Sequence, residues 1–222
     1  MQVLVTGATG YIGSRLLPAL MRRGHQVSAL TRPQSARRLA PGCRAVIGDA
    51  LDAASYALAI DGADALVHLV GVPHPSPAKA ALFRSVDLAS AREAVAAALA
   101  ARVKHFVYLS VAQPAPVMRA YVAARAEGEA LIRASGIAAS FLRPWYVVGP
   151  GHRWPLVLLP AYYLLERLPV THEAARRFGL VSVEQMVRAI VRAVEDPPLG
   201  VRVLEVPDIR CATDQDCPPV SP

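Results

Sequence analysis

Short runs of largely apolar residues recur along the chain, and most of them end in a glycine or a small polar residue. Runs of this length, without regular polar alternation, are typical of parallel β-strands that are buried on both faces of a sheet. The pattern therefore predicts seven strands: Val3–Val5, Gln26–Leu30, Ala45–Ile47, Ala65–Leu69, Phe106–Leu109, Ile137–Leu142 and Val201–Val206.

Between the strands, apolar residues recur at the spacing of a helix. The clearest predicted helices are Ser14–Arg23, Leu88–Arg102, Ala120–Ser135 and Val183–Val194. Gly24 and Gly136 directly follow two of them, where glycine commonly ends a helix. Strands and helices that alternate in this way predict the α/β class, with a doubly wound parallel sheet and right-handed crossovers, which is a Rossmann fold.

The alternation is regular up to the Gly149–Gly151 turn and weaker after it. We expect residues 1–150 to form the Rossmann domain, residues 151–210 a small C-terminal extension integrated with it, and residues 211–222 a loose tail. Within the extension, Trp154–Pro169 carries large apolar side chains and few charges. It is either an additional packing layer or the lid of an apolar substrate pocket.

The amino-acid composition narrows the classes of function that the protein can have. With 54% hydrophobic and 18% charged residues, the 222-residue chain suits a folded domain and excludes a disordered or fibrous protein. The net charge of +7 comes from arginines scattered singly or in pairs, so we do not expect nucleic-acid binding. Three cysteines without metal-type spacing predict a reducing compartment and no metal site. We see no signal peptide, and Leu156–Leu165 is too short to span a membrane, which predicts a cytoplasmic location.

A glycine-rich turn lies between the first predicted strand and the first predicted helix. It reads Gly-Ala-Thr-Gly-Tyr-Ile-Gly from Gly7 to Gly13. Glycines at this spacing allow a tight turn, let backbone N–H groups approach a pyrophosphate and let the helix pack closely on the strand, while the helix N-terminus attracts negative charge. The turn therefore predicts dinucleotide binding, with contacts from Gly7, Thr9, Gly10, Tyr11, Ile12 and Gly13.

The end of the second strand indicates which dinucleotide is bound. About twenty residues after the glycines, a carboxylate would bind a ribose 2′-hydroxyl, but this chain has Thr31 and Arg32 there, with Arg37 and Arg38 nearby. A guanidinium can form a fork on a 2′-phosphate. We therefore expect NADP(H) rather than NAD(H), with Thr31, Arg32 and Arg37 at the site. Alternatively, Arg32 is a solvated loop residue.

Several segments match the motifs of one known superfamily. They are Val3–Gly13, Gly48-Asp49, Val67–Gly71, Val103–Ser110 and Leu142-Arg143-Pro144 before Gly149. Over about residues 1–150, and more weakly through Leu180–Glu184, the chain thus resembles the short-chain dehydrogenase/reductase superfamily. It is most similar to atypical members, namely the NmrA-like proteins and the nucleotide-binding accessory subunit of respiratory complex I. The resemblance implies adenine contacts by Asp49 and Ala50, an adenosine wall of Leu69, Val70 and Gly71, and a nicotinamide side formed by Pro144 and Trp145.

The superfamily's reactive centre is a Tyr-x-x-x-Lys pair, and the matching residues here are Tyr121 and Arg125. A spacing of four places both side chains on one helix face, so Arg125 can hold the nicotinamide ribose hydroxyls. A guanidinium stays charged, which excludes a proton relay through this residue, but Tyr121 can still donate a proton to a carbonyl oxygen. The superfamily's active hydroxyl matches Ala112, which leaves Ser110 and Gln113 as candidate donors to that oxygen.

Other residues at the predicted ligand-binding edge are candidates for the substrate pocket. His74 follows a strand at its C-terminal end, the edge where open α/β sheets bind ligands. The other pocket candidates are Gln113, Trp145, His152 and Trp154. His68, by contrast, lies inside a buried-strand pattern and is expected to be a core residue.

Two hypotheses of different classes follow. The leading one is an NADPH-dependent reductase that transfers hydride to a small apolar carbonyl or conjugated substrate, with Tyr121 as the proton donor. The other is a non-catalytic NADP(H)-binding protein, such as a redox sensor or an assembly factor, in which Tyr121 and Arg125 only anchor the cofactor. The sequence pattern leaves the oligomeric state open.

Overall fold

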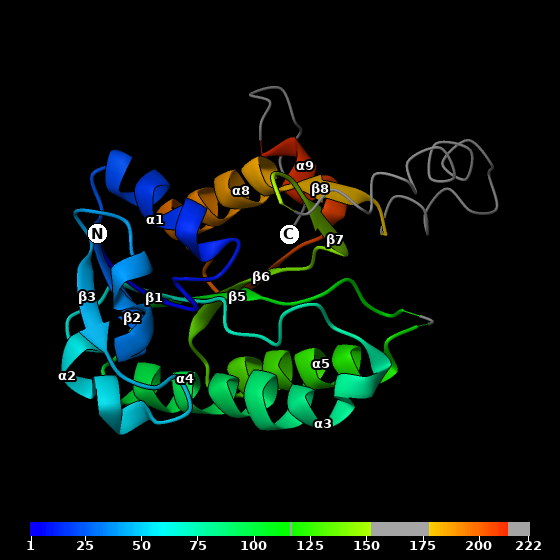
Figure 1. The fold of residues 1–222 in the computed structure, drawn as a ribbon, viewed down its shortest axis with the longest axis horizontal. Coiled ribbons are helices and arrows are strands. Elements are labelled where there is room, and N and C mark those ends of the chain that lie inside the picture. The colour runs from blue at the N-terminus through cyan, green and yellow to red at the C-terminus, as the bar shows by residue number, and fades with distance from the viewer. Residues whose placement is uncertain (116, 152–177, 213–222) are drawn as a thin grey trace.

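The computed structural model of the protein describes residues 1–115, 117–151 and 178–212. A central sheet of seven parallel strands runs through it in the order β3-β2-β1-β4-β5-β6-β9 (Figure 1). This order confirms the predicted doubly wound sheet. The strands are β1 (Gln2–Thr6), β2 (Gln26–Thr31), β3 (Arg44–Ile47), β4 (Ala65–His68), β5 (His105–Leu109), β6 (Ala138–Leu142) and β9 (Val201–Leu204).

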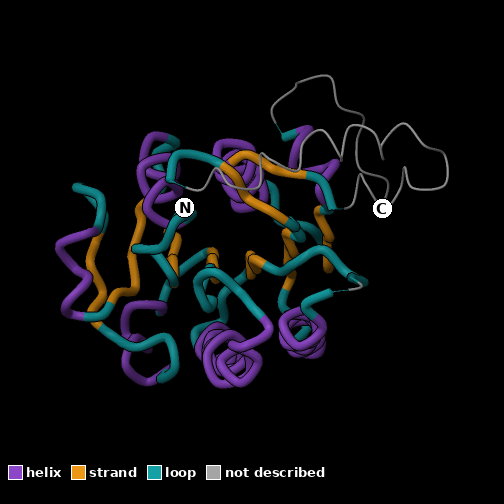
Figure 2. Tube along the Cα trace, turned by 45° about the vertical axis from the view of Figure 1, so that its right-hand side comes forward, coloured by secondary structure: helices purple, strands orange, loops and turns teal. Residues whose placement is uncertain are grey.

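Helices cover both faces of the sheet, so the strands lie between two helical layers (Figure 2). On one face α1 and α8 lie side by side, and on the other α4 and α5 form the layer (Figure 1). The helices are α1 (Gly13–Arg22), α2 (Ala57–Ile60), α3 (Ala80–Leu82), α4 (Ala89–Ala100), α5 (Arg119–Ala134), α8 (Val183–Glu195) and α9 (Val206–Cys211).

Each face of the sheet has its own hydrophobic core. Along β1, Val3 and Val5 belong to the cluster that contains α1 and α8, whereas Leu4 belongs to the cluster beneath α4. Because side chains alternate between the faces of a strand, a continuous apolar run fills both cores at once. The two cores thereby hold the strand ends in place, and the loops that follow these ends carry the candidate site.

Besides short helical turns that the sequence pattern did not predict, among them α2, the described residues depart from the prediction in three places. The predicted helix Leu88–Arg102 extends in the N-terminal direction through a π-helical turn, Phe83–Leu88, as far as α3. The last strand ends at Leu204 and is followed by α9, so Cys211, expected in a loose tail, belongs to a helix. A second, two-stranded parallel sheet joins β7 (Tyr146–Val148) and β8 (Leu180–Ser182). Three-residue strands are too short to show a period in the sequence.

In the ranges that the structure describes, no helix has both the length and the apolar character needed to cross a membrane. The same residues contain no group of three or more His, Cys, Asp and Glu side chains that could hold a metal ion. The segment Trp154–Pro169, interpreted as a packing layer or a lid, lies outside the described residues, as do His152 and the tail from residue 213.

Candidate active site

The glycine turn connects β1 to α1 and leaves no room for side chains at two of its positions. Gly7 has a φ of 72°, and a Cβ there would lie 2.7 Å from the carbonyl carbon of Leu69. A Cβ at Gly13 would overlap the backbone oxygens of Gly7 and Ala8. Helix α1 then begins without a side-chain cap and without an acidic residue in its first turn. The turn is thus a bare backbone cradle at a helix N-terminus, which fits a pyrophosphate.

An arginine beside the predicted 2′-phosphate residues contacts this turn directly. Arg38 donates from Nη2 to the carbonyl oxygen of Thr9 at 3.2 Å. It ends the 3-10 turn Pro33–Arg38, which follows β2 directly after Arg32. Arg32 and Arg37 are exposed on the same turn, and Thr31 is buried at the end of β2. Arg38, noted in the sequence only as a neighbour of Arg32 and Arg37, is therefore the arginine after β2 that the structure joins to the glycine turn.

The loop after β4 lies against the glycine turn, and the guanidinium of Arg125 fills the space behind it. Arg125 donates from Nη1 to the carbonyl oxygen of Leu109 at 2.9 Å and from Nη2 to that of Val70 at 3.1 Å. A Cβ on Gly71 would overlap the Arg125 guanidinium. Arg125 therefore joins the ends of β4 and β5, and Gly71 leaves it the space to do so.

The partner of Arg125 is a buried carboxylate that the sequence analysis did not single out. Asp87 lies in the π-helical turn, and its Oδ1 is 2.8 Å from Arg125 Nη2. Its Oδ2 accepts a hydrogen bond from the Val72 N–H at 3.0 Å. Burial raises the pKa of the Asp87 carboxyl, and the Arg125 guanidinium opposes that rise. A π-helical turn frequently marks a functional site, but the sequence pattern does not reveal one.

Tyr121 lies one turn before Arg125 on α5. Its ring centroid is 5.4 Å from Arg125 Cζ and 5.1 Å from the Phe83 ring. Val72 and Met118 pack in the same small apolar cluster. Among the described residues, the Tyr121 hydroxyl has no hydrogen-bond partner, whereas both terminal nitrogens of the nearby guanidinium are hydrogen-bonded. The hydroxyl can therefore reach a ligand placed at the strand ends.

Ser110 and Gln113 donate hydrogen bonds to another buried carboxylate, that of Glu129 on α5. Ser110 Oγ and Gln113 Nε2 reach Glu129 Oε1 at 2.6 and 2.7 Å. Arg143 completes the cluster with hydrogen bonds to the same carboxylate at 2.9 and 2.6 Å. The hydroxyl proposed to polarise a substrate oxygen thus points at Glu129, a residue that the sequence analysis did not name. Only its i+4 spacing from Arg125 on α5 could have indicated it.

The remaining predicted residues lie around this centre. Asp49 is exposed after β3, where its Oδ1 accepts from the Leu51 N–H at 3.0 Å, and Ala50 is half-buried. The Pro144 carbonyl accepts from the Ala112 N–H at 3.0 Å. Trp145 packs edge-on against Phe178, with centroids 5.1 Å apart.

The two histidines of the region differ in their surroundings. His74 is exposed with a φ of 50°, at the loop after β4. His68 is fully buried between the Thr6 and Ser90 hydroxyls, at 2.9 and 3.3 Å, so the expectation of a core residue agrees with its placement. Burial, followed by the charge of Arg125, lowers the pKa of His68 to about 3. His68 is therefore a neutral core residue and not a proton donor.

The chain is similar in sequence or in fold to several known proteins. A family described as NAD(P)H-binding matches residues 7–152. A ceramide reductase of Caulobacter vibrioides (strain NA1000 / CB15N) is 28% identical over 94% of this chain, which spans 65% of that enzyme's length. A 3-diazoavenalumate denitrifying reductase of Streptomyces sp is 33% identical to this chain. The match covers 90% of this chain and 74% of that reductase's length. The crystal structure of the Bordetella bronchiseptica enzyme WbmH in complex with NAD+ superposes with a TM-score of 0.68, at 24% identity over 92% of this chain and 75% of that one.

Proposed function

Because the chain belongs to the NAD(P)H-binding family and resembles the short-chain dehydrogenase/reductase superfamily, we propose that it is an NADPH-dependent reductase of a small apolar carbonyl or conjugated compound. The observation that carries the proposal is Tyr121, whose hydroxyl has no partner among the described residues and whose ring lies beside the buried guanidinium of Arg125. The apolar cluster around it, with Phe83, Val72 and Met118, suits an apolar substrate. Two relatives that share most of this chain are named as reductases.

In this proposal, each part of the site has its own role. The Gly7–Gly13 turn and the start of α1 bind the pyrophosphate, and the arginines after β2 bind a 2′-phosphate. The adenine side is formed by Asp49 and Ala50, and the nicotinamide side by Pro144 and Trp145. When bound, the reduced nicotinamide supplies the hydride. Tyr121 donates a proton to the substrate oxygen, and Arg125 positions the loops after β4 and β5 through Val70 and Leu109.

A second candidate function rests on a specific observation. Ser110 and Gln113 both donate to Glu129, and Arg125 is buried against Asp87. A non-catalytic NADP(H)-binding sensor or assembly protein would need no polarising donor, which agrees with this arrangement. Under that alternative, Tyr121 only contacts the bound cofactor.

Replacement of Tyr121 by phenylalanine separates the two functions. For the reductase, Tyr121→Phe is expected to lower kcat by about 100-fold or more, with NADPH affinity changed by less than about twofold. Turnover is followed by NADPH absorbance with a panel of aldehydes, ketones and quinones. Tyr56→Phe is the matched control, because it removes a buried hydroxyl without a hydrogen-bond partner, in a different apolar cluster from that of Tyr121. NADPH binding without turnover of any compound by the wild-type protein would favour the sensor.

A further inference from the structure

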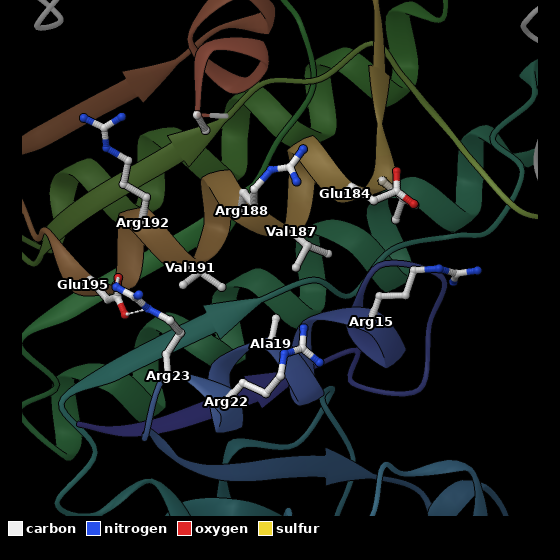
Figure 3. Close-up of a pocket in the computed structure, with 12 residues that line it drawn as sticks. Arg15, Ala19, Arg22, Arg23, Glu184, Val187, Arg188, Val191, Arg192 and Glu195 are labelled. Carbon is white, nitrogen blue, oxygen red and sulfur yellow. Dashed lines mark hydrogen bonds and ion pairs between the residues drawn. The ribbon is translucent and has the colours of Figure 1, made fainter. Parts of the chain in front are cut away.

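A groove runs between α1 and α8 on the face of the sheet opposite α4 and α5. Figure 3 shows Arg188 and Arg192 along its α8 side and Arg15 and Arg22 along its α1 side. At one end, Arg23 forms a bidentate ion pair with Glu195, with both nitrogen–oxygen distances at 2.8 Å. The groove has a volume of about 730 Å³, which is the size of a small-molecule site.

Positive charge in this groove exceeds the negative charge available to neutralise it. Five arginines line it against two glutamates, Glu184 and Glu195. Arg15 and Arg23 are engaged, the former with the Tyr11 and Pro150 carbonyl oxygens. In the part of the chain that the structure describes, the guanidiniums of Arg22, Arg188 and Arg192 have no hydrogen-bond or ion-pair partner. Three unpaired guanidiniums on two facing helices are available to an acidic group that enters the groove, and each can form a fork on it.

The floor of the groove is apolar. Ala19 of α1 and Val187 and Val191 of α8 lie between the two rows of arginines (Figure 3). The valines are spaced by four residues and are nearly buried, so the floor is a firm part of the core. An apolar strip between two basic rims matches a ligand that has both an acidic group and an apolar body.

We propose that this groove binds a small organic anion, with its phosphate or carboxylate group held by the free arginines of the rim, Arg22, Arg188 or Arg192, and its apolar body on the alanine and valine floor. The site is separate from the dinucleotide turn but touches it through one residue. Arg15 lines the groove and donates from Nη1 to the Tyr11 carbonyl oxygen at 2.7 Å, inside the glycine turn. An anion in the groove therefore lies one side chain from the cofactor-binding backbone.

Phenyl phosphate is a suitable probe, because it combines a dianion with an apolar ring. Its binding to the full chain is measured by isothermal titration calorimetry at one fixed salt concentration, in parallel with inorganic phosphate. The double variant R188Q/R192Q is expected to weaken phenyl phosphate binding by about tenfold or more, since two charge-assisted hydrogen bonds are lost. The variant R44Q/R102Q removes the same charge from exposed arginines outside the groove and is expected to change binding by less than about twofold. Inorganic phosphate is expected to bind about tenfold more weakly, because it cannot use the floor.

Four results would overturn the proposal. The first is no detectable binding of phenyl phosphate. The second is an equal loss in R44Q/R102Q, which would mean attraction by net charge alone. The third is a loss of binding in Arg38→Gln, which would place the probe on the glycine turn. The fourth is equal affinity for inorganic phosphate, which would remove the role of the apolar floor. None of these results bears on the Tyr121 test, so the two proposals fail independently.

Discussion

Arg38 is the residue through which cofactor preference can be tested. Its guanidinium already contacts the glycine turn at Thr9, and Arg32 lies at the start of the same 3-10 turn. We expect Arg38→Gln and Arg32→Gln each to weaken NADPH binding by about tenfold, because a charge-assisted fork to the 2′-phosphate is worth about 1.5 to 3 kcal/mol. NADH binding is expected to change by less than about twofold. Fluorescence titration with both dinucleotides measures this, and equal losses for NADPH and NADH would contradict the 2′-phosphate role.

The burial of His68 leads to a prediction about how the stability of the fold depends on pH. Its pKa in the folded protein is about 3, against an ordinary value of 6.5. Below about pH 6.5 the unfolded chain binds a proton at this residue and the folded protein does not, so stability falls as the pH falls toward 3. One such histidine contributes a loss of about 1.4 kcal/mol for each pH unit. His105, whose pKa burial lowers to about 4, acts in the same direction.

Urea denaturation of wild type and His68→Asn at about pH 7 and pH 4.5 checks this effect. The free energy of unfolding is expected to fall by roughly 2 to 3 kcal/mol more in the wild type than in the variant over that interval. His74→Asn is the control, because His74 is exposed. Parallel pH dependences of wild type and His68→Asn would show that His68 is not buried in its neutral form.

At the scale of elements, a buried ion pair joins the π-helical turn to α5, beside the packing of Phe83 on Tyr121. Removing one partner leaves an uncompensated buried charge, so Asp87→Asn is expected to cost about 3 to 5 kcal/mol of unfolding free energy. The double variant D87L/R125M removes both charges and is expected to lose less than Asp87→Asn alone. Asp64→Asn breaks the exposed pair with Lys104 and is expected to cost less than about 1 kcal/mol.

Chemical denaturation of these three variants measures how much the ion pair contributes to the free energy of unfolding. A smaller loss for Asp87→Asn than for Asp64→Asn would show that Asp87 and Arg125 do not interact as the structure has them. If D87L/R125M lost more unfolding free energy than Asp87→Asn, the ion pair would stabilise the fold more than an apolar pair in its place. Near-ultraviolet circular dichroism shows whether the packing of Tyr121 on Phe83 persists in each variant.

The elements show which features the sequence could predict. Strand and helix order and the glycine turn follow from local patterns, namely apolar runs and glycine spacing, whereas Tyr121 is identified through the resemblance to a known superfamily. Asp87, Glu129 and the Thr9 contact of Arg38 could not be found in this way. Each depends on a tertiary partner 14 to 38 residues away in the chain, and a local pattern does not specify which polar side chains meet in the interior.

For the whole molecule, the glycine turn joins both halves of the sheet, since Gly7 lies against Leu69 and Tyr11 lies against Gly149. A ligand that binds this backbone only in the folded state raises the free energy of unfolding by about 2.7 kcal/mol at a concentration of 100 times its Kd. We expect NADPH to raise the thermal midpoint accordingly. Gly10→Ala is expected to keep the fold, because its Cβ meets only the Gly7 carbonyl oxygen at 3.1 Å, but to abolish this shift by placing a methyl group at the turn.

The control for that prediction is Gly200→Ala, where a Cβ meets nothing within 4 Å and the backbone is not left-handed. It is expected to show the full NADPH-dependent shift in a thermal melt. If Gly10→Ala were stabilised by NADPH as much as Gly200→Ala, the dinucleotide would bind elsewhere than on the turn. If Gly10→Ala alone lost the shift, the bare backbone between β1 and α1 would be the part of the molecule through which the cofactor stabilises the whole sheet.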